Sequence, residues 1–130
     1  MTTKRNAFIV AAILLALPAA ASAAGDPVAG KVVANKCMVC HSFTAGENRI
    51  GPSLAGVVGR KSGSIPNFNY SPAMKSIGLT WTEDTLDKYL TSPKAVVPGT
   101  KMIFAGLPVA ADRANLIAYL SQTGAAASGK

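Results

Sequence analysis

The stretch Cys37-Met38-Val39-Cys40-His41 decides the fold, because it places two cysteines three positions apart and a histidine directly after them. Residues i and i+3 share one face of a helical turn, so both thiols point to the same side. This C-x-x-C-H pattern is the attachment signature of a c-type haem. Each thiol can add to one haem vinyl group, and the histidine can ligate the iron. The motif therefore predicts one covalent haem, anchored by Cys37 and Cys40 and ligated by His41.

Other interpretations of the cysteine pair are weaker. A disulfide within C-x-x-C closes a very small loop and stabilises little. A thioredoxin-like redox pair is expected in a βαβ context, which the sequence lacks. A zinc site needs further ligands, but the chain has only two cysteines and one histidine.

The second iron ligand decides between electron transfer and chemistry at an open iron. Met38 lies inside the attachment motif, and Met74 lies within an expected helix, where core packing is more usual. Met102 ends the segment Pro98-Gly99-Thr100-Lys101-Met102, a rigid bend far enough along the chain to reach the other side of a haem. We therefore expect Met102 to ligate the iron through its thioether. An open position would instead favour gas binding or peroxide chemistry.

The first 23 residues resemble an export signal. Lys4 and Arg5 form a positive start, Ala7 to Leu17 is an unbroken apolar run, and Ala21-Ser22-Ala23 suits a signal peptidase. We expect residues 1–23 to be removed and residues 24–130 to form a single periplasmic domain without a membrane span. An uncleaved membrane anchor is the alternative, although the run is shorter than the ~20 residues that a span needs.

The charge of the chain fits a soluble protein with acidic partners. Its formal net charge of +7 falls to +5 without Lys4 and Arg5. The remaining basic residues are scattered along the chain, which argues against nucleic-acid binding and favours solubility and docking to acidic surfaces.

Helical periodicity and capping signals predict an all-α fold with long loops. We expect helices from about 27 to 37, where Val28, Val32 and Val33 give an amphipathic pattern, and from about 72 to 78. A third should begin after Thr80 or Thr82 and end at Pro93, and a fourth should run from about 108 to 124. Residues 42–65 and 94–104 read as loops, and the tail after about 124 as flexible.

From about 25 to 123 the chain resembles a class I cytochrome c, of the bacterial soluble kind most similar to mitochondrial cytochrome c. The motifs that carry the resemblance are, in order, CMVCH, GPSLAGVVGRKSGS, FNYSPAM, WTEDTLDKYLTSPKAVVPGTKMIFAG and LIAYL. The resemblance implies the single-domain cytochrome c fold, short helices and long loops around one haem. It also implies an electron carrier that is not an enzyme.

The resemblance assigns roles to further residues. It implies thioethers at Cys37 and Cys40, iron ligation by His41 and Met102, and a Pro52 carbonyl that orients the histidine. Tyr89 matches a tyrosine near the methionine sulfur, and Phe104 an aromatic near the haem edge. Four residues match partners of the haem propionates: Arg60, Tyr70, Trp81 and Thr100. Without the resemblance, Trp81 and Tyr89 would read as core, Arg60 as a solvated charge and Pro52 as a turn proline.

The resemblance also implies how the protein meets its partners. Lys36, Lys94 and Lys101 match lysines that dock on acidic redox proteins, although lysines also simply keep a surface hydrated. The implied donor is a quinol:cytochrome c reductase, and the implied acceptor is a terminal oxidase or a photosynthetic acceptor, met by a monomer. The sequence departs from the family in two places. Val33 and Ala34 lie near the position of an aromatic that would pack on Tyr119, which predicts a weaker contact between the first and last helices, and Met74 stands where a polar side chain is usual.

Overall fold

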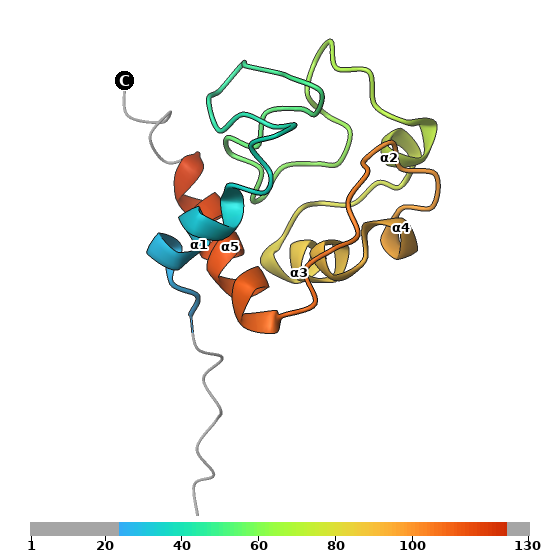
Figure 1. Ribbon diagram of the computed structural model, residues 1–130. Coiled ribbons are helices and arrows are strands. Elements are labelled where there is room, and N and C mark those ends of the chain that lie inside the picture. The colour runs from blue at the N-terminus through green and yellow to red at the C-terminus, as the bar shows by residue number, and fades with distance from the viewer. Residues whose placement is uncertain (1–23, 125–130) are drawn as a thin grey trace, which may run out of the picture.

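A computed structural model describes residues 24–124 of the chain, and it has the all-α architecture that the sequence predicts (Figure 1). The expected signal peptide and the tail after residue 124 lie outside the described residues. Residues 24–124 form no β-strand, and one isolated antiparallel bridge joins Lys61 to Thr80. The helices are α1 (Pro27–Ala34), α2 (Pro72–Ser76), α3 (Glu83–Thr91), α4 (Pro93–Val96) and α5 (Ala110–Thr123).

The first three helices begin where their capping residues predict. The Asp26 carboxylate accepts the backbone N–H of Val28, and the Ser71 hydroxyl accepts that of Met74. The Thr82 hydroxyl accepts the N–H of Thr85, which settles the choice between Thr80 and Thr82 as the cap of α3. Each bond satisfies a backbone donor that a helix start would otherwise leave unpaired.

Several helix boundaries differ from the prediction, and α1 ends at Ala34 rather than near residue 37. The segment after Pro93 was expected to be a loop, but it forms the single helical turn of α4, with Pro93 at its first position. Proline is tolerated there because its missing N–H would have no helical partner. The last helix begins at Ala110, two residues after Pro108, and its cap Val109 provides no side-chain hydrogen bond.

The packing of α1 against α5 is the main contact between helices, and it turns a different face of α1 inward from the one that its valines suggest. Figure 1 shows α1 lying across α5. Val28 and Val32 are 77% and 68% exposed, whereas Gly30 and Ala34 are buried. A Cβ atom at Gly30 would overlap the backbone carbonyl of Asn115. Small residues therefore decide which face meets α5, because they let the two backbones approach closely.

An aromatic pair beside this contact accounts for the missing aromatic of the first helix. Phe43 packs edge-on against Tyr119, with ring centroids 5.4 Å apart and an interplanar angle of 73°. Phe43 follows the haem motif and so comes from the loop rather than from α1. The expected weakening of the contact around Tyr119 is therefore offset, because such aromatic pairs are favourable.

The core lies between α3, α5 and the loops that cross them. Arg113 on α5 pairs with Asp87 on α3, with Nε and Oδ1 2.7 Å apart, and its guanidinium also donates to the carbonyl of Leu107. These bonds join α5 to α3 and to the segment that precedes α5. The buried apolar residues are Ala34, Val57, Trp81, Leu86, Tyr89, Leu90, Val97, Leu107, Leu116, Ile117 and Leu120.

Candidate haem-binding site

The cysteine motif lies on helical turns that continue from α1. The N–H of Cys37 donates to Ala34 O at 2.9 Å, that of Cys40 to Cys37 O at 3.1 Å, and that of His41 to Cys37 O at 2.8 Å. These i to i+3 and i+4 bonds hold the two cysteines on one face, as their spacing predicts. Both side chains are half-buried, and they form no disulfide with each other. Burial raises the pKa of the Cys37 thiol.

His41 makes a hydrogen bond to the Pro52 carbonyl, the contact that the family resemblance implies. Its Nδ1 lies 2.7 Å from Pro52 O. A carbonyl can only accept, so Nδ1 carries the proton and Nε2 keeps a free lone pair. Burial lowers the pKa of His41, the bond to Pro52 opposes this shift, and the charge of Arg60 adds to it. The imidazole is therefore neutral at neutral pH, which is the form that binds metals.

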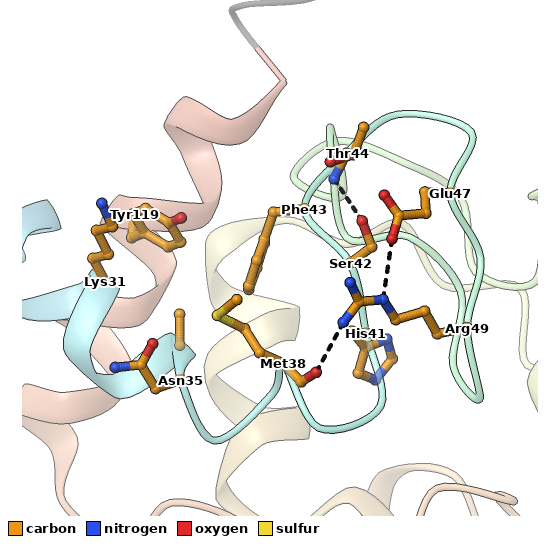
Figure 2. Close-up of a pocket in the computed structure, with 11 residues that line it drawn as sticks. Lys31, Asn35, Met38, His41, Ser42, Phe43, Thr44, Glu47, Arg49 and Tyr119 are labelled. Carbon is orange, nitrogen blue, oxygen red and sulfur yellow. Dashed lines mark hydrogen bonds and ion pairs between the residues drawn. The ribbon is translucent and has the colours of Figure 1, made fainter.

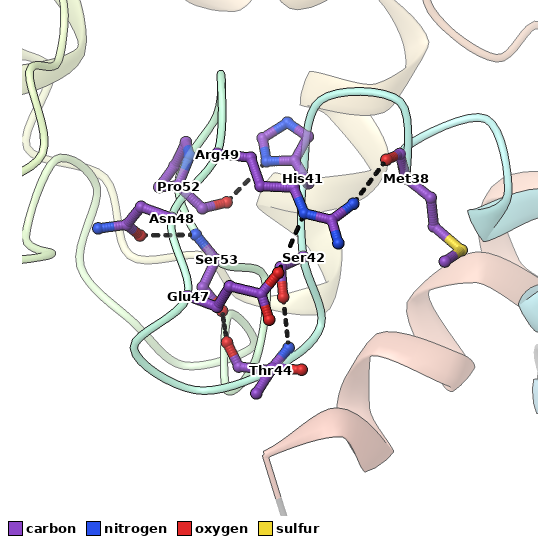
Figure 3. Close-up of polar contacts among 9 residues, drawn as sticks. All are labelled: Met38, His41, Ser42, Thr44, Glu47, Asn48, Arg49, Pro52 and Ser53. Atoms are coloured by element: carbon purple, nitrogen blue, oxygen red, sulfur yellow. Dashed lines mark hydrogen bonds and ion pairs between the residues drawn. The ribbon is translucent and has the colours of Figure 1, made fainter.

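The loop that presents Pro52 is joined to the motif at several points (Figure 3). The N–H of Gly51 donates to Cys40 O at 2.8 Å, and Arg49 Nη1 donates to Met38 O at 3.3 Å. A Cβ atom at Gly51 would overlap the His41 ring, so only glycine allows the loop to pass this closely. The loop and the histidine thus form one unit.

Arg60 is half-buried rather than freely solvated. Its Nη1 donates to Ala55 O at 3.1 Å and its Nη2 to Ser53 O at 2.9 Å. Burial lowers the pKa of Arg60, and the neighbouring Tyr70 hydroxyl partly opposes this. The Tyr70 hydroxyl in turn accepts the N–H of Ile65 at 3.3 Å. The assignment of Arg60 and Tyr70 to the haem propionates stays a prediction.

On the other side of the site, Tyr89 connects Trp81 to Met102. Trp81 and Tyr89 are buried, with ring centroids 4.8 Å apart. The Tyr89 hydroxyl donates to Met102 Sδ at 3.8 Å, as the resemblance implies. Burial raises the pKa of Tyr89, and a hydrogen bond with the Thr100 side chain opposes this. The phenol therefore stays protonated at neutral pH and remains a donor to the sulfur.

The segment that carries Met102 is held from both sides. The N–H of Met102 donates to Thr100 Oγ1 at 3.2 Å. Lys101 Nζ donates to Asn69 O at 3.2 Å, which ties the segment to the loop before α2. Lys101 thus has a structural bond as well as its expected surface position. Lys36, Lys94 and Lys101 are all exposed.

Two surface hollows flank these groups. The first, about 240 Å³, lies between α1 and the loop after the motif, and Figure 2 shows Met38 and Phe43 beside it. The second, about 370 Å³, is lined by Ser92, Lys94, Ile103, Phe104 and Ala105, so the predicted residues Lys94 and Phe104 share one surface feature.

The donor set fits a haem. His41 offers a neutral nitrogen with a free lone pair, and Met102 offers a soft, neutral sulfur. Two backbone hydrogen bonds join the two groups, from the N–H of Gly59 to Trp81 O at 2.7 Å and from the N–H of Trp81 to Arg60 O at 2.8 Å. Several apolar side chains around both groups are only partly buried on the core, as residues in contact with an apolar cofactor would be: Cys37, Leu54, Met74, Leu79, Met102 and Phe104.

The helical fold and the C-x-x-C-H motif indicate a small protein that carries a covalently attached cofactor, and comparisons with known proteins identify the family. The family model described as Cytochrome c matches residues 28–124. Cytochrome c2 of Rhodomicrobium vannielii is 57% identical over 104 residues, 79% of this chain and 83% of that protein. Cytochrome c2 of Rhodoblastus acidophilus is 55% identical over 100 residues, 76% of this chain and 94% of that protein.

A solved structure agrees with these relatives. Cytochrome cH from Methylobacterium extorquens has a TM-score of 0.71 and 42% sequence identity, and the match covers 74% of this chain and 97% of that one. The chain belongs to the cytochrome c family. Members of this family carry electrons and are not enzymes, and they bind haem c, which confirms the cofactor that the C-x-x-C-H motif predicts.

Sequence reasoning missed the residues that support the predicted ones. Gly51 passes against the His41 ring, and Asn48 and Ser53 hold the loop on either side of Pro52. The signal for Gly51 was present in the Gly-Pro pair that follows the motif. Nothing in the sequence singled out Asn48, because a polar residue in a loop has no required partner.

Proposed function

We propose that this chain is an exported, soluble carrier of single electrons. Cys37 and Cys40 would hold the haem through thioethers, and His41 and Met102 would ligate its iron. The bound haem supplies a one-electron couple, whose potential its axial ligands and their hydrogen bonds set.

The observation that carries the proposal is that each candidate ligand is held by a hydrogen bond that leaves its donor atom free. Pro52 occupies Nδ1 of His41 and leaves Nε2 available. Tyr89 holds Met102 through one hydrogen bond to sulfur, and a thioether sulfur has a second lone pair for a metal. Ligands fixed in this way need little rearrangement when the charge at the metal changes, which favours electron transfer.

The remaining predicted residues suit the polar and apolar edges of the cofactor. Arg60 is half-buried and is influenced electrostatically by Tyr70, and both are proposed as partners of a haem carboxylate, which needs such groups when it is buried. Trp81 and Thr100 flank Tyr89 and complete the proposed set of propionate partners. Phe104 lies beside Lys94 and is proposed to cover the haem edge.

The proposed location is the periplasm, reached through the signal peptide of residues 1–23. In the part of the chain that the structure describes, no helix has the length and hydropathy of a membrane span. The exposed Lys36, Lys94 and Lys101 support transient docking of a monomer on acidic partners. A quinol:cytochrome c reductase is the proposed donor, and an oxidase or a photosynthetic acceptor the proposed acceptor.

A pair of methionine variants tests the ligation. Met102→Ala should convert the haem to a form that binds carbon monoxide readily. Met74→Ala, which removes a partly buried methionine from α2, should leave a haem that does not bind carbon monoxide readily. Equal carbon monoxide binding by both variants and the parent would overturn Met102 as the ligand and favour a gas-binding or peroxidase function.

Intact mass spectrometry of the exported protein tests two further alternatives. The proposal predicts a chain that begins near Ala24 and carries one haem. A mass that includes residues 1–23 would indicate a membrane-tethered cytochrome. A mass without haem would indicate a thiol–disulfide protein.

A further inference from the structure

We propose that Asn48 is a positioning residue that aims the Pro52 carbonyl at His41, and that it thereby tunes the reduction potential. The inference rests on the proposed ligation by His41. Asn48 is exposed and lies four residues before Pro52 in the loop that follows the motif. Its own side chain does not reach the histidine.

The connection runs through one peptide group. The carbonyl of Pro52 and the N–H of Ser53 belong to the same planar unit and point in opposite directions. The oxygen lies 2.7 Å from His41 Nδ1, and the nitrogen donates to Asn48 Oδ1 at 3.0 Å. Figure 3 shows the Asn48 amide and the His41 ring on opposite sides of this unit. Any rotation that misdirects the carbonyl must therefore also break the bond to Asn48.

The rest of Ser53 is fixed, which makes Asn48 the side-chain partner of this peptide N–H. Ser53 is 3% exposed, and its hydroxyl donates to Thr44 O at 2.6 Å. Its carbonyl accepts from Arg60 Nη2 at 2.9 Å. These bonds hold the residue after the peptide, while Asn48 holds the peptide itself.

The same bond also strengthens the carbonyl as an acceptor. Hydrogen bonds in a chain polarise one another, so an N–H that donates to Asn48 leaves more negative charge on the Pro52 oxygen. A stronger bond from Nδ1–H makes the imidazole a more basic ligand, which favours the oxidised protein. Loss of the Asn48 amide should therefore raise the reduction potential.

The test compares Asn48→Ala with Thr44→Ala in the haem-loaded protein. Thr44 is exposed in the same loop, and within residues 24–124 its side chain makes no hydrogen bond. Asn48→Ala should raise the potential by at least about 18 mV, a twofold change in the reduction equilibrium at 59 mV per tenfold. It should also speed solvent exchange of the His41 Nδ1 proton by about fivefold, the effect of losing one ordinary hydrogen bond. Thr44→Ala should change neither quantity.

The outcomes separate this inference from the proposed function. An Asn48→Ala protein with lower stability but the potential and proton exchange of Thr44→Ala would show a merely structural role and overturn the inference. A parent protein whose spectrum lacks a histidine ligand would overturn the proposed function, and the inference with it.

Discussion

At the scale of single residues, His41 and Met102 are the proposed iron ligands. Each is neutral, half-buried and held by one hydrogen bond, from Nδ1 to Pro52 O at 2.7 Å and from the Tyr89 hydroxyl to Sδ at 3.8 Å. The two bonds act in opposite senses: the first makes the nitrogen a better donor, whereas the second withdraws density from the sulfur. The reduction potential should respond to each in a predictable direction.

Removal of the Tyr89 hydroxyl should lower the potential. In Tyr89→Phe the sulfur of Met102 loses its hydrogen bond and becomes a better donor to the oxidised iron. A weak bond of ~0.5–1 kcal/mol corresponds to a fall of about 20–40 mV, measurable by redox titration. Tyr119→Phe is the control, because Tyr119 packs on Phe43 rather than on Met102. An unchanged or higher potential in Tyr89→Phe would show that the hydroxyl does not act on the ligand.

The histidine should make stability depend on pH. The pKa of His41 is lower in the folded protein than its ordinary value of about 6.5, because burial disfavours the charged form. Its contribution to stability is therefore present above about pH 6.5 and is lost as the pH falls toward the folded pKa. Iron bound at Nε2 would act in the same direction, because the proton and the metal compete for one lone pair. Urea unfolding should therefore give a smaller free energy of unfolding at pH 5.5 than at pH 7. His41 is the only histidine in the chain. A free energy of unfolding that stays constant between pH 5.5 and pH 7 would therefore contradict a lowered pKa of His41 in the folded protein.

At the scale of elements, the crossing of α1 and α5 supports the site because α1 continues into the haem motif. Gly30 makes the crossing possible, since its missing side chain leaves room for the Asn115 carbonyl. The bond from the N–H of Asp26 to Asn115 Oδ1 at 2.8 Å ties the start of α1 to the same residue of α5. A displacement of α1 would move both cysteines.

Substitution of Gly30 by alanine should reverse the usual effect of helix propensity. In an exposed helix this change stabilises by about 1 kcal/mol. At Gly30 the new methyl group would overlap Asn115, so we expect a loss of about 1–3 kcal/mol. Gly46→Ala is a useful comparison, because Gly46 has a φ of +78° and a Cβ atom added there would meet no other atom within 4 Å, so only backbone strain acts. Denaturant unfolding measures both, and a stabilised Gly30→Ala protein would contradict the packing argument.

The elements also show what the sequence could predict. Local signals sufficed for the helix starts at Asp26, Ser71 and Thr82, because a cap bonds within its own turn. The inward face of α1 was mispredicted because the close approach of Gly30 depends on a partner far along the chain. The Phe43–Tyr119 pair was missed for the same reason.

The residues of the candidate site also fall into those that the sequence could predict and those that it could not. The motif and the family resemblance supplied Pro52 and Tyr89, and each contacts the predicted ligand. The bonds of Arg60 to the carbonyls of Ser53 and Ala55 could not be predicted, because a backbone carbonyl leaves no mark in the sequence. The proposed role of Asn48 could not be predicted either, because its partner is the backbone N–H of Ser53.

For the molecule as a whole, the basic charge should control encounters with redox partners. Residues 24–130 carry a formal charge of +5, the +7 of the full chain less Lys4 and Arg5. Electron transfer to the anion hexacyanoferrate should slow as salt rises from 10 to 150 mM, by about two- to tenfold, since the Debye length falls from about 30 to 8 Å. A cationic cobalt complex should show the opposite trend in stopped-flow measurements. The same trend for both oxidants would exclude electrostatic steering.

The central claim is that the chain closes its haem iron with His41 and Met102, and one measurement tests it most directly. The visible absorption spectrum of the exported protein is recorded oxidised, reduced, and reduced under carbon monoxide. We predict sharp low-spin bands on reduction, the weak sulfur-to-iron band on oxidation, and no change with carbon monoxide. A high-spin spectrum, or ready uptake of carbon monoxide, would show that Met102 does not close the site, and would contradict the assignment as a simple electron carrier.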